Sequence, residues 1–342
     1  MKHKLLLLLA AAALLCSCHS QRQALALGAD ISWETELESR GHTFATASGT
    51  EMECTQLMQT LGLNAVRLRV WVNPANGYCN AQDLLAKALR AKRLGMDIMV
   101  DFHYSDMWAD PGKQYTPAAW ADHNAQQLAD DVAQHTKEVL TLLKDNGIVP
   151  KWVQIGNETT HGLLWPLGRA EEQPDNYAAF IQSGCRAAKE VFPQVLTIVH
   201  LDNGFDQALY DWNLGILKQR GVDYDLIGMS LYPVTAPEWH PDKAATPELA
   251  ISRCFSNIAH LWETLGKQTI ITEVGVRVSQ PEQGKKYLGE VVKNARRAKH
   301  CLGVFYWEPE APNDYNGGYD MGAFESHGKQ LRPTIIMDAF KR

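Results

Sequence analysis

The sequence predicts a single (β/α)8 barrel of the TIM type, and three observations favour it: chain length, segment alternation and the residues at segment ends. The chain has 342 residues, of which 45% are hydrophobic and 21% charged. This suits one barrel, which takes about 250 residues or more. From residue 27 onward, short apolar runs rich in β-branched residues alternate with longer segments of helical periodicity, as in repeated βα units.

Eight runs have the length and composition of buried strands. They are residues 27–32, 65–71, 97–103, 152–157, 196–201, 226–231, 269–273 and 304–307. Amphipathic stretches lie between them, including 56–61, 81–94 and 124–144. Eight strands with intervening helices close one barrel. A doubly wound sheet is the rival architecture, but no GxGxxG turn follows the first run and the sequence has no P-loop, so nucleotide binding is not expected.

Each run ends in polar or aromatic residues. These are Asp30, Arg69, Trp71, His103, Asn157, Glu158, His200, Asp202, Tyr232, Glu273 and Trp307. Active sites of barrel enzymes lie at the carboxyl ends of the strands, so we expect these side chains to meet there. The longest irregular connections follow His103, Glu158, Tyr232 and Trp307, on the same predicted face, where long loops are usually functional.

Two glutamates at strand ends suggest glycoside hydrolysis. One carboxylic acid must protonate the leaving oxygen, and one carboxylate must handle the anomeric carbon. We predict Glu158 as general acid/base and Glu273 as nucleophile of a retaining mechanism, with carboxyl groups about 5 to 5.5 Å apart. Burial or the Glu273 charge should raise the pKa of Glu158. Arg69 and Tyr232 are expected to keep Glu273 ionised, and Asn157 to bind a sugar 2-hydroxyl.

Further strand-end and loop residues are predicted to contact the substrate. The full set is Asp30, Arg69, His103, Asp106, Trp108, Asn157, Asp202, Tyr232 and Trp307. Structural alternatives stay open, since a glutamate at a strand end is more often a cap or an ion-pair partner. Arg67, which alternates with Arg69, could close a buried ion pair, and His103 could be a satisfied strand-end histidine. Several of the ten tryptophans, such as Trp262, fit the core better.

Read together, the strand-end motifs resemble one known family. They are residues 28–32 (GADIS), 67–71 (RLRVW), 101–106 (DFHYSD), 108–111 (WADP), 154–158 (QIGNE), 162–166 (GLLWP), 230–233 (SLYP), 272–273 (TE) and 306–309 (YWEP). This pattern is similar to that of the endo-β-1,4-galactanases of glycoside hydrolase family 53, over almost the whole chain from residue 28.

The resemblance implies a substrate as well as catalytic roles. It implies Glu158 as acid/base, Glu273 as nucleophile, and internal cleavage of the β-1,4-galactan in type I arabinogalactan side chains of pectin. Two alternatives remain. One is another barrel endo-glycanase, a β-mannanase or cellulase, that uses the same two glutamates. The other is a surface glycan-binding lipoprotein without catalysis.

The resemblance also bears on cofactors. No cofactor is required for the chemistry. Some bacterial members of the family hold calcium in the loop after the last strand, and here Asp314, Asp320 and carbonyl groups within 313–322 could offer oxygen ligands. No CxxC spacing supports a zinc site, and Cys54, Cys79, Cys185, Cys254 and Cys301 are expected to be mostly buried thiols with at most one or two disulfides.

Charge restricts the class of partner. The formal net charge is -6, and lysine and arginine are scattered rather than clustered. A nucleic-acid partner is therefore not expected, and a neutral polysaccharide fits better. We expect a monomer.

The N-terminus predicts export. A lysine-containing start, an apolar run over 5–15 and Cys16-Ser17-Cys18 follow the order of a secretory signal, and the run is too short for a membrane span of about 20 residues. Residues 15–18 resemble a lipobox. We predict a lipoprotein signal over 1–17, a lipidated Cys18 with a short tether to 27, and the barrel over 28–342. The protein would then be a membrane-anchored lipoprotein at the cell surface or in the periplasm of a Gram-negative bacterium. The alternative is an ordinary cleaved signal without a lipid.

Overall fold

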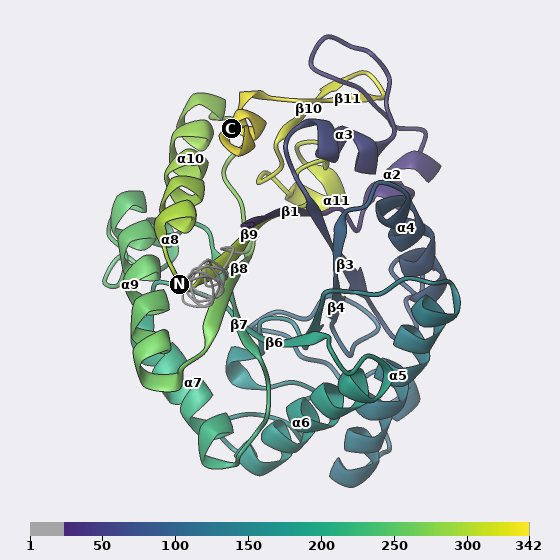
Figure 1. The fold of residues 1–342 in the computed structure, drawn as a ribbon, viewed down its shortest axis with the longest axis vertical. Coiled ribbons are helices and arrows are strands. Elements are labelled where there is room, and N and C mark those ends of the chain that lie inside the picture. The colour runs from purple at the N-terminus through teal and green to yellow at the C-terminus, as the bar shows by residue number, and fades with distance from the viewer. Residues whose placement is uncertain (1–23, 342) are drawn as a thin grey trace, which may run out of the picture.

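A computed structural model describes residues 24–341. Eight parallel strands close into a barrel in the order β1-β3-β4-β5-β6-β7-β8-β9, which confirms the predicted fold (Figure 1). The strands are β1 Ala26–Asp30, β3 Ala65–Val70, β4 Asp97–Phe102, β5 Trp152–Ile155, β6 Leu196–Leu201, β7 Leu226–Leu231, β8 Gln268–Val274 and β9 Cys301–Trp307. Each coincides with one predicted run. The predicted signal and the lipidated Cys18 lie outside the described residues.

Helices form a ring around the barrel, as Figure 1 shows. They are α2 Glu34–Ser39, α3 Cys54–Thr60, α4 Ala81–Arg93, α5 Ala125–Asp145, α6 Pro174–Val191, α7 Gln207–Gln219, α9 Pro247–Leu265, α10 Pro281–Arg297 and the C-terminal 3-10 helix η3 Ile335–Phe340. Local sequence sets the helix starts: the side chain of Asn80 accepts from the first turn of α4, and Asn124 forms a capping box with Gln127 at α5. The three helices predicted from periodicity correspond to α3, α4 and α5.

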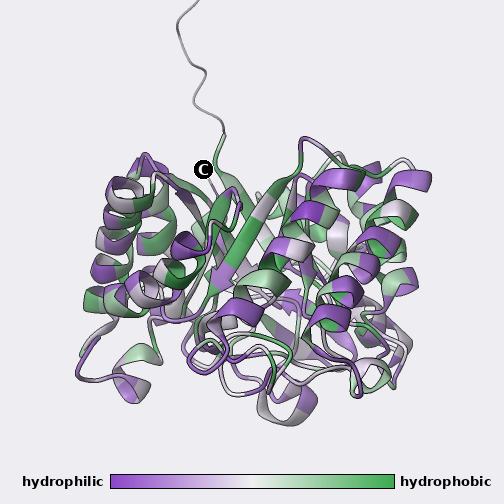
Figure 2. Ribbon diagram, turned by 90° about the horizontal axis from the view of Figure 1, so that it is seen from below, coloured by the Kyte–Doolittle hydropathy of each residue, from purple (hydrophilic) through white to green (hydrophobic). Residues whose placement is uncertain are grey.

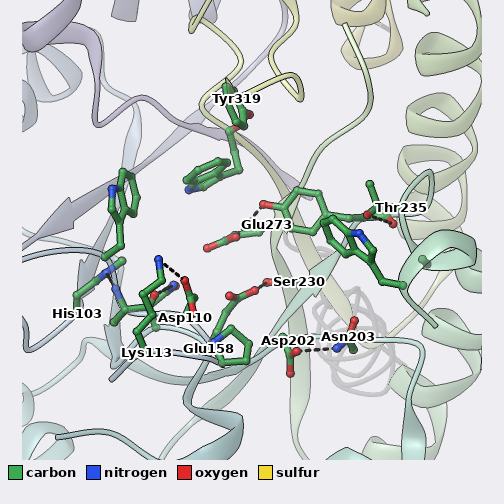
Figure 3. Close-up of a pocket in the computed structure, with 18 of the residues that line it drawn as sticks. His103, Asp110, Lys113, Glu158, Asp202, Asn203, Ser230, Thr235, Glu273 and Tyr319 are labelled. Atoms are coloured by element: carbon green, nitrogen blue, oxygen red, sulfur yellow. Dashed lines mark hydrogen bonds and ion pairs between the residues drawn. The ribbon is translucent and has the colours of Figure 1, made fainter. Parts of the chain in front are cut away.

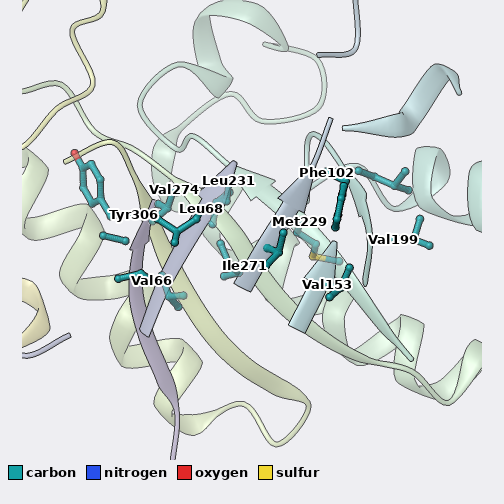
Figure 4. Packing of buried hydrophobic residues seen from close by; sticks show 14 of the residues in the cluster. Val66, Leu68, Phe102, Val153, Val199, Met229, Leu231, Ile271, Val274 and Tyr306 are labelled. Atoms are coloured by element: carbon teal, nitrogen blue, oxygen red, sulfur yellow. The ribbon is translucent and has the colours of Figure 1, made fainter. Parts of the chain in front are cut away.

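The main core lies between the strands and the helices. Side chains that point outward from the strands, such as Val66, Leu68, Val199 and Ile271, are fully buried there (Figure 4). The helices cover them with one apolar face, and hydrophilic and hydrophobic residues occur together along the helices (Figure 2).

The barrel interior has an apolar lower layer. Each of the eight strands contributes one residue: Ala26, Ala65, Met99, Trp152, Ile198, Leu226, Ile270 and Phe305. The rings of Trp152 and Phe305 meet edge to face with centroids 5.9 Å apart. Because side chains alternate along a strand, the residue two positions further on also points inward. On β3, β4, β5 and β6 these residues are polar and form the floor of the site: Arg67, Asp101, Gln154 and His200.

Loops at the carboxyl ends of the strands carry the remaining elements. They include the 3-10 helices η1 Ala118–Trp120 and η2 Thr159–His161 and the short helices α8 Ala236–Trp239 and α11 Tyr315–Gly318. A small sheet of β10 Phe324–His327, β11 Gln330–Pro333 and β2 Thr43–Phe44 joins the first loop to the last. Among residues 24–341, no helix combines the length and apolar character that a membrane crossing needs. The five cysteines of this part of the chain are buried free thiols.

Candidate active site

A cleft of about 550 Å³ opens at the carboxyl ends of the strands, a size within the range of about 300–1,000 Å³ typical of ligand sites. Glu158 and Glu273 both line it. Figure 3 shows their carboxyl groups pointing into the same space from different strands. The structure thus brings together the two glutamates that the sequence singled out.

Glu158 reaches the cleft through a tight turn after β5. Gly156 and Glu158 both have left-handed backbone conformations, with φ of 79° and 46°. A Cβ atom at Gly156 would lie 2.4 Å from the side chain of Thr159, so only glycine fits this turn. The left-handed conformation is unusual for glutamate and typical of residues held in place for function. The hydroxyl of Ser230 donates to Glu158 Oε1 at 2.6 Å.

Glu273 reaches the cleft through an irregularity in β8. Met229 pairs with Ile271, but the next residue, Ser230, pairs with Glu273, so the register shifts by one residue. A shift of this kind changes the direction of side chains in one strand. It explains why Glu273 faces the cleft although Ile270 faces the barrel interior, which strict alternation would not allow.

Arg67 and Tyr232 hold the carboxylate of Glu273. The guanidinium Nη2 of Arg67 lies 3.0 Å from Oε1, and the Tyr232 hydroxyl donates to Oε2 at 2.9 Å. Arg67 also pairs with Asp30 at 2.7 Å and with Asp101 at 2.9 Å, and it is fully buried. Tyr232 contacts Glu273 as expected, and its role in keeping that carboxylate ionised stays a prediction. The prediction that Arg69 orients Glu273 is wrong, because Arg67 occupies that position.

The two carboxyl groups differ in the interactions that oppose the rise of pKa caused by burial. Burial raises the pKa of Glu158 well above its usual value, the negative charges of Glu273 and Asp202 raise it further, and the hydrogen bond from the neutral Ser230 hydroxyl opposes this. Burial raises the pKa of Glu273 to about 7, while the charge of Arg67 opposes the shift strongly. Glu158 therefore holds its proton more tightly than Glu273 does. Such a separation of two pKa values is the pattern expected of an acid and an ionised partner.

Asp30 and Arg69 lie beneath the cleft and do not line it. Asp30 is fully buried and pairs with Arg67. Arg69 pairs with Glu308 at 2.9 Å, and its guanidinium lies 4.1 Å from the ring centroid of Trp108, which covers it. The prediction that these two residues contact substrate is wrong. Both arginines of β3 point inward. The way the barrel closes determines how far each lies from the cleft along the barrel axis.

Asp106 and His103 both make structural hydrogen bonds, and for His103 this is the structural alternative that the sequence left open. The carboxylate of Asp106 accepts from the backbone N–H groups of Asn73 at 2.9 Å and Ala118 at 2.8 Å, and it does not line the cleft. The ring of His103 borders the cleft, but Nε2 bonds to Asp101 at 3.0 Å and Nδ1 accepts from the Ala109 N–H at 3.1 Å. The prediction that Asp106 contacts substrate is therefore wrong. His103 borders the cleft with both ring nitrogens engaged, and its contact with substrate stays a prediction.

The other predicted contacts border the cleft. They are Trp108, Asn157, Asp202, Tyr232 and Trp307. The Oδ1 atom of Asn157 accepts from Arg67 at 2.7 Å, which fixes the orientation of the amide. Its Nδ2 group donates to the carbonyl of Ala109 at 2.9 Å. An amide nitrogen carries two hydrogens, so the second can serve a sugar hydroxyl.

Aromatic side chains form one wall of the cleft. The ring of Trp33 lies 5.6 Å from Trp108, 5.4 Å from Trp307 and 5.3 Å from Tyr319, between centroids. All four line the cleft, and Trp239 lines it with an exposed fraction of 64%. Flat apolar faces beside polar groups suit sugar rings, which have both kinds of surface.

Comparison with known sequences decides the family. A model of the family described as glycosyl hydrolase family 53 matches residues 26–334. This chain belongs to glycosyl hydrolase family 53. It is therefore a glycosidase, in agreement with the predicted reaction class.

Individual relatives of this family 53 chain are similar over most of their length. An arabinogalactan endo-β-1,4-galactanase of Thermothelomyces thermophilus is 32% identical over 335 residues, which cover 90% of this chain and 97% of the relative. A probable arabinogalactan endo-β-1,4-galactanase A of Aspergillus terreus is 33% identical, over 82% of this chain and 84% of the relative. A solved fungal β-1,4-galactanase superposes with a TM-score of 0.83 at 29% identity, over 93% of this chain and 100% of the other.

The calcium site implied by the resemblance finds no support in this family 53 structure. Among residues 24–341, no group of three or more histidine, cysteine or acidic side chains is arranged to hold a metal. Asp320 is ion-paired with Arg277, and Asp314 accepts from the amide of Asn313 at 3.4 Å. These donors do not form an oxygen cage for calcium.

Several residues of the site were not assigned from the sequence. The sequence indicates Arg67 only as one member of a buried ion pair, and it does not single out Trp33, Ser230 or Tyr319. Trp33 follows the first predicted strand directly, so its position was a usable signal. Tyr319 belongs to a long loop whose path the local sequence does not determine.

Proposed function

We propose that this chain is a retaining endo-β-1,4-galactanase acting on type I arabinogalactan, with Glu158 as acid/base and Glu273 as nucleophile. The observation that carries the assignment is the unequal pair of carboxyl groups in one cleft: Glu273 paired with Arg67, and Glu158 facing a neutral hydroxyl. The galactanase names of two relatives and one similar structure support the substrate. No feature of the described residues favours mannan or cellulose.

The reaction needs two displacements. In the first, the Glu273 carboxylate attacks the anomeric carbon, the bond to the leaving oxygen breaks, and Glu158 gives that oxygen its proton. A galactosyl ester of Glu273 results. In the second, the Glu158 carboxylate takes a proton from water, the water oxygen attacks the anomeric carbon, and Glu273 leaves as carboxylate. Two inversions retain the configuration.

The surrounding residues support both steps. Arg67 and Tyr232 keep Glu273 ionised and oriented before attack and stabilise it again as a leaving group. The remaining N–H of Asn157 is placed to bind the sugar 2-hydroxyl, a contact that strengthens in the transition state. The aromatic wall orients the sugar rings.

A first experiment tests the substrate and the acid together. Purified wild-type protein and Glu158→Gln are incubated with linear β-1,4-galactan, β-mannan and carboxymethylcellulose. We expect short oligosaccharides from galactan alone, and their loss in the variant. Cleavage of mannan or cellulose instead would favour another endo-glycanase, and no cleavage by folded wild type would favour a glycan-binding protein.

A second experiment tests the nucleophile by stereochemistry. Glu273→Ala with a dinitrophenyl β-galactoside and azide should give the α-galactosyl azide, because azide enters from the face that Glu273 has vacated. Glu158→Ala with the same reagents should give the β-azide, formed by attack on the intermediate. A β-product from the Glu273 variant would remove that residue from the role of nucleophile.

We also propose that the enzyme is exported as a lipoprotein, with a signal over 1–17 and lipid on Cys18, at the surface or in the periplasm of a Gram-negative bacterium. The order of charged, apolar and small residues at the N-terminus supports this proposal. Palmitate labelling tests it: label should disappear in Cys18→Ser and persist in Cys16→Ser. Label that persists in Cys18→Ser would contradict the lipobox assignment.

A further inference from the structure

A buried hydrogen-bond chain leads from β6 to Glu158. The Nε2 atom of His200 lies 2.9 Å from Ser230 Oγ, and Ser230 Oγ lies 2.6 Å from Glu158 Oε1. His200 is fully buried and does not border the cleft. Figure 3 shows Ser230 next to the Glu158 carboxyl. The two displacements described above do not use His200, so its position there requires another explanation.

The neighbours of His200 determine which of its nitrogens carries hydrogen. The backbone N–H of Glu158 points at Nδ1 at 3.4 Å and has no other acceptor among the described residues. The Gln154 Nε2 group lies 3.0 Å from Nδ1 and shares its two hydrogens among Nδ1, Asp101, the Gly156 carbonyl at 3.0 Å and Asn157 Oδ1 at 3.1 Å. The Gln154 amide cannot turn around, because its Oε1 accepts from Arg67 at 3.1 Å and its Nε2 donates to Asp101 at 2.6 Å. Nδ1 is therefore an acceptor.

The opposite tautomer would leave a backbone donor unpaired. A hydrogen on Nδ1 could be accepted only by Asn157 Oδ1, at 3.0 Å, which already accepts from Arg67 at 2.7 Å. The Glu158 N–H, which points at Nδ1, would then face another N–H and have no acceptor among the described residues. Burial and the charge of Arg67 lower the pKa of His200 well below its usual value, so the ring is neutral with its hydrogen on Nε2.

The hydrogen on Nε2 determines the direction of each hydrogen bond between His200 and Glu158. His200 donates to Ser230 Oγ, and the single hydroxyl hydrogen of Ser230 is then left to donate to Glu158 Oε1. An oxygen that accepts this hydrogen is the unprotonated one. The proton of the acid must therefore reside on Oε2.

We propose that His200, acting through Ser230, is a positioning residue that keeps Glu158 Oε1 an acceptor and so places the acid proton on Oε2. This inference rests on the proposed role of Glu158 as acid/base. In the first displacement the proton leaves Oε2 for the leaving oxygen, and in the second a proton from water returns to Oε2. No hydrogen moves within the chain itself. The Ser230 bond strengthens when Glu158 becomes charged.

Other charged groups face this chain and stay in place when Ser230 or His200 is replaced. Glu273 on β8, Asp202 after β6 and Asp110 after β4 act on Glu158. Arg67 on β3 and Asp101 and His103 from the β4 region act on His200. Comparison of variants therefore isolates the hydroxyl and the imidazole from these charges.

The test compares two substrates that differ in their need for an acid. Galactan has a poor leaving group that must be protonated, whereas a 2,4-dinitrophenyl β-galactobioside has one that needs no proton. In both, kcat/KM reports the first displacement. We expect Ser230→Ala to lower kcat/KM on galactan by about tenfold or more and on the aryl substrate by less than about twofold. The alkaline limb should move to higher pH, because the hydroxyl favours the charged form of Glu158.

Two further variants serve as matched controls. Ser230→Thr keeps the hydroxyl and should recover most of the activity on galactan. Thr269→Val removes a buried hydroxyl of β8 that has no hydrogen-bond partner among the described residues, and both substrates should react as in wild type. Equal losses on both substrates in Ser230→Ala would mean a merely structural role and would overturn the proposal.

A double-mutant cycle tests whether His200 acts through Ser230. His200→Leu should lower activity on galactan in the wild-type background but change it by less than about twofold when Ser230 is already alanine. Fully additive losses would contradict the chain. Thermal melting checks folding, and His200→Gln takes the place of the leucine variant if that variant unfolds.

The outcomes separate this inference from the proposed function. If wild-type protein cleaves neither galactan nor the aryl galactoside, the proposed function fails. If wild type cleaves both and Ser230→Ala matches it on galactan, only the inference fails.

Discussion

The lower and upper parts of the barrel interior are built by the same strands from opposite kinds of side chain. The lower layer is apolar, with Trp152 and Phe305 as its largest members. Two residues further along the strands, Arg67, Asp101 and Gln154 form a fully buried polar layer. The apolar layer stabilises the fold by packing alone. The polar layer is costly to desolvate, and its fixed hydrogen bonds instead orient the carboxyl groups above it.

The comparison shows that one layer of the barrel interior provides stability and that the other orients the groups of the site. A buried ion pair is weak evidence for stability, because desolvation offsets the attraction, but removal of one partner leaves an unpaired buried charge. A packed apolar residue, in contrast, has no charged partner that its removal would leave unpaired. Variants of the two layers should therefore fail in different ways, and the following predictions use that difference.

The largest effect is expected for Arg67→Met in the upper layer. The change removes the common cation of Asp30, Asp101 and Glu273, so kcat/KM on galactan should fall by about a thousandfold or more. The free energy of unfolding should fall by about 3–5 kcal/mol, measured by denaturant titration. Arg67→Lys keeps the charge but not the planar fork, so its activity should stay low. Wild-type stability in Arg67→Met would break the comparison.

A large effect of a different kind is expected for Trp152→Ala in the lower layer. A cavity replaces the ring that packs against Phe305, and the free energy of unfolding should fall by about 3–5 kcal/mol. The folded fraction should keep kcat/KM within about twofold of wild type, since the polar layer separates Trp152 from the cleft. Trp152→Phe, which fills part of the space, serves as control. A loss of kcat without a loss of stability would show that the layers are coupled.

The pH dependence of kcat/KM should show the different environments of the two carboxyl groups. Glu273 must be ionised, so activity falls as the pH drops through its pKa, which burial raises to about 7. Glu158 must be protonated, so activity falls as the pH rises through its pKa, which burial raises further. Tyr232→Phe removes a donor to the Glu273 carboxylate and should move the acidic limb up by about one unit. An acidic limb that stays at the usual value for glutamate would argue against this account.

The smallest effect is expected for Thr269→Val. Its buried hydroxyl has no hydrogen-bond partner within residues 24–341, so valine should stabilise the protein by up to about 1 kcal/mol. Thermal melting measures the change. A loss of more than that amount would indicate a partner for the hydroxyl, such as a bound water.

Local sequence predicted the strands and the two glutamates, because a strand end and its last side chain are close in the chain. The sequence did not distinguish Arg67 from Arg69, because both point inward. Their heights relative to Glu273 depend on the stagger of distant strands. The register shift that turns Glu273 into the cleft likewise arises between β7 and β8. Contacts of this kind are properties of the closed barrel and leave no local pattern.

Barrel closure also has a consequence for when the protein can fold. β1 pairs with β9, so that Ala29 lies beside Tyr306, and β2 pairs with β11. Contacts between the two ends of a chain form late, because a long loop must close first. Until β9 has been synthesised, β1 lacks one neighbour and the apolar layer lacks Phe305. The apolar layer inside the barrel is therefore complete only once β1 and β9 have both been synthesised.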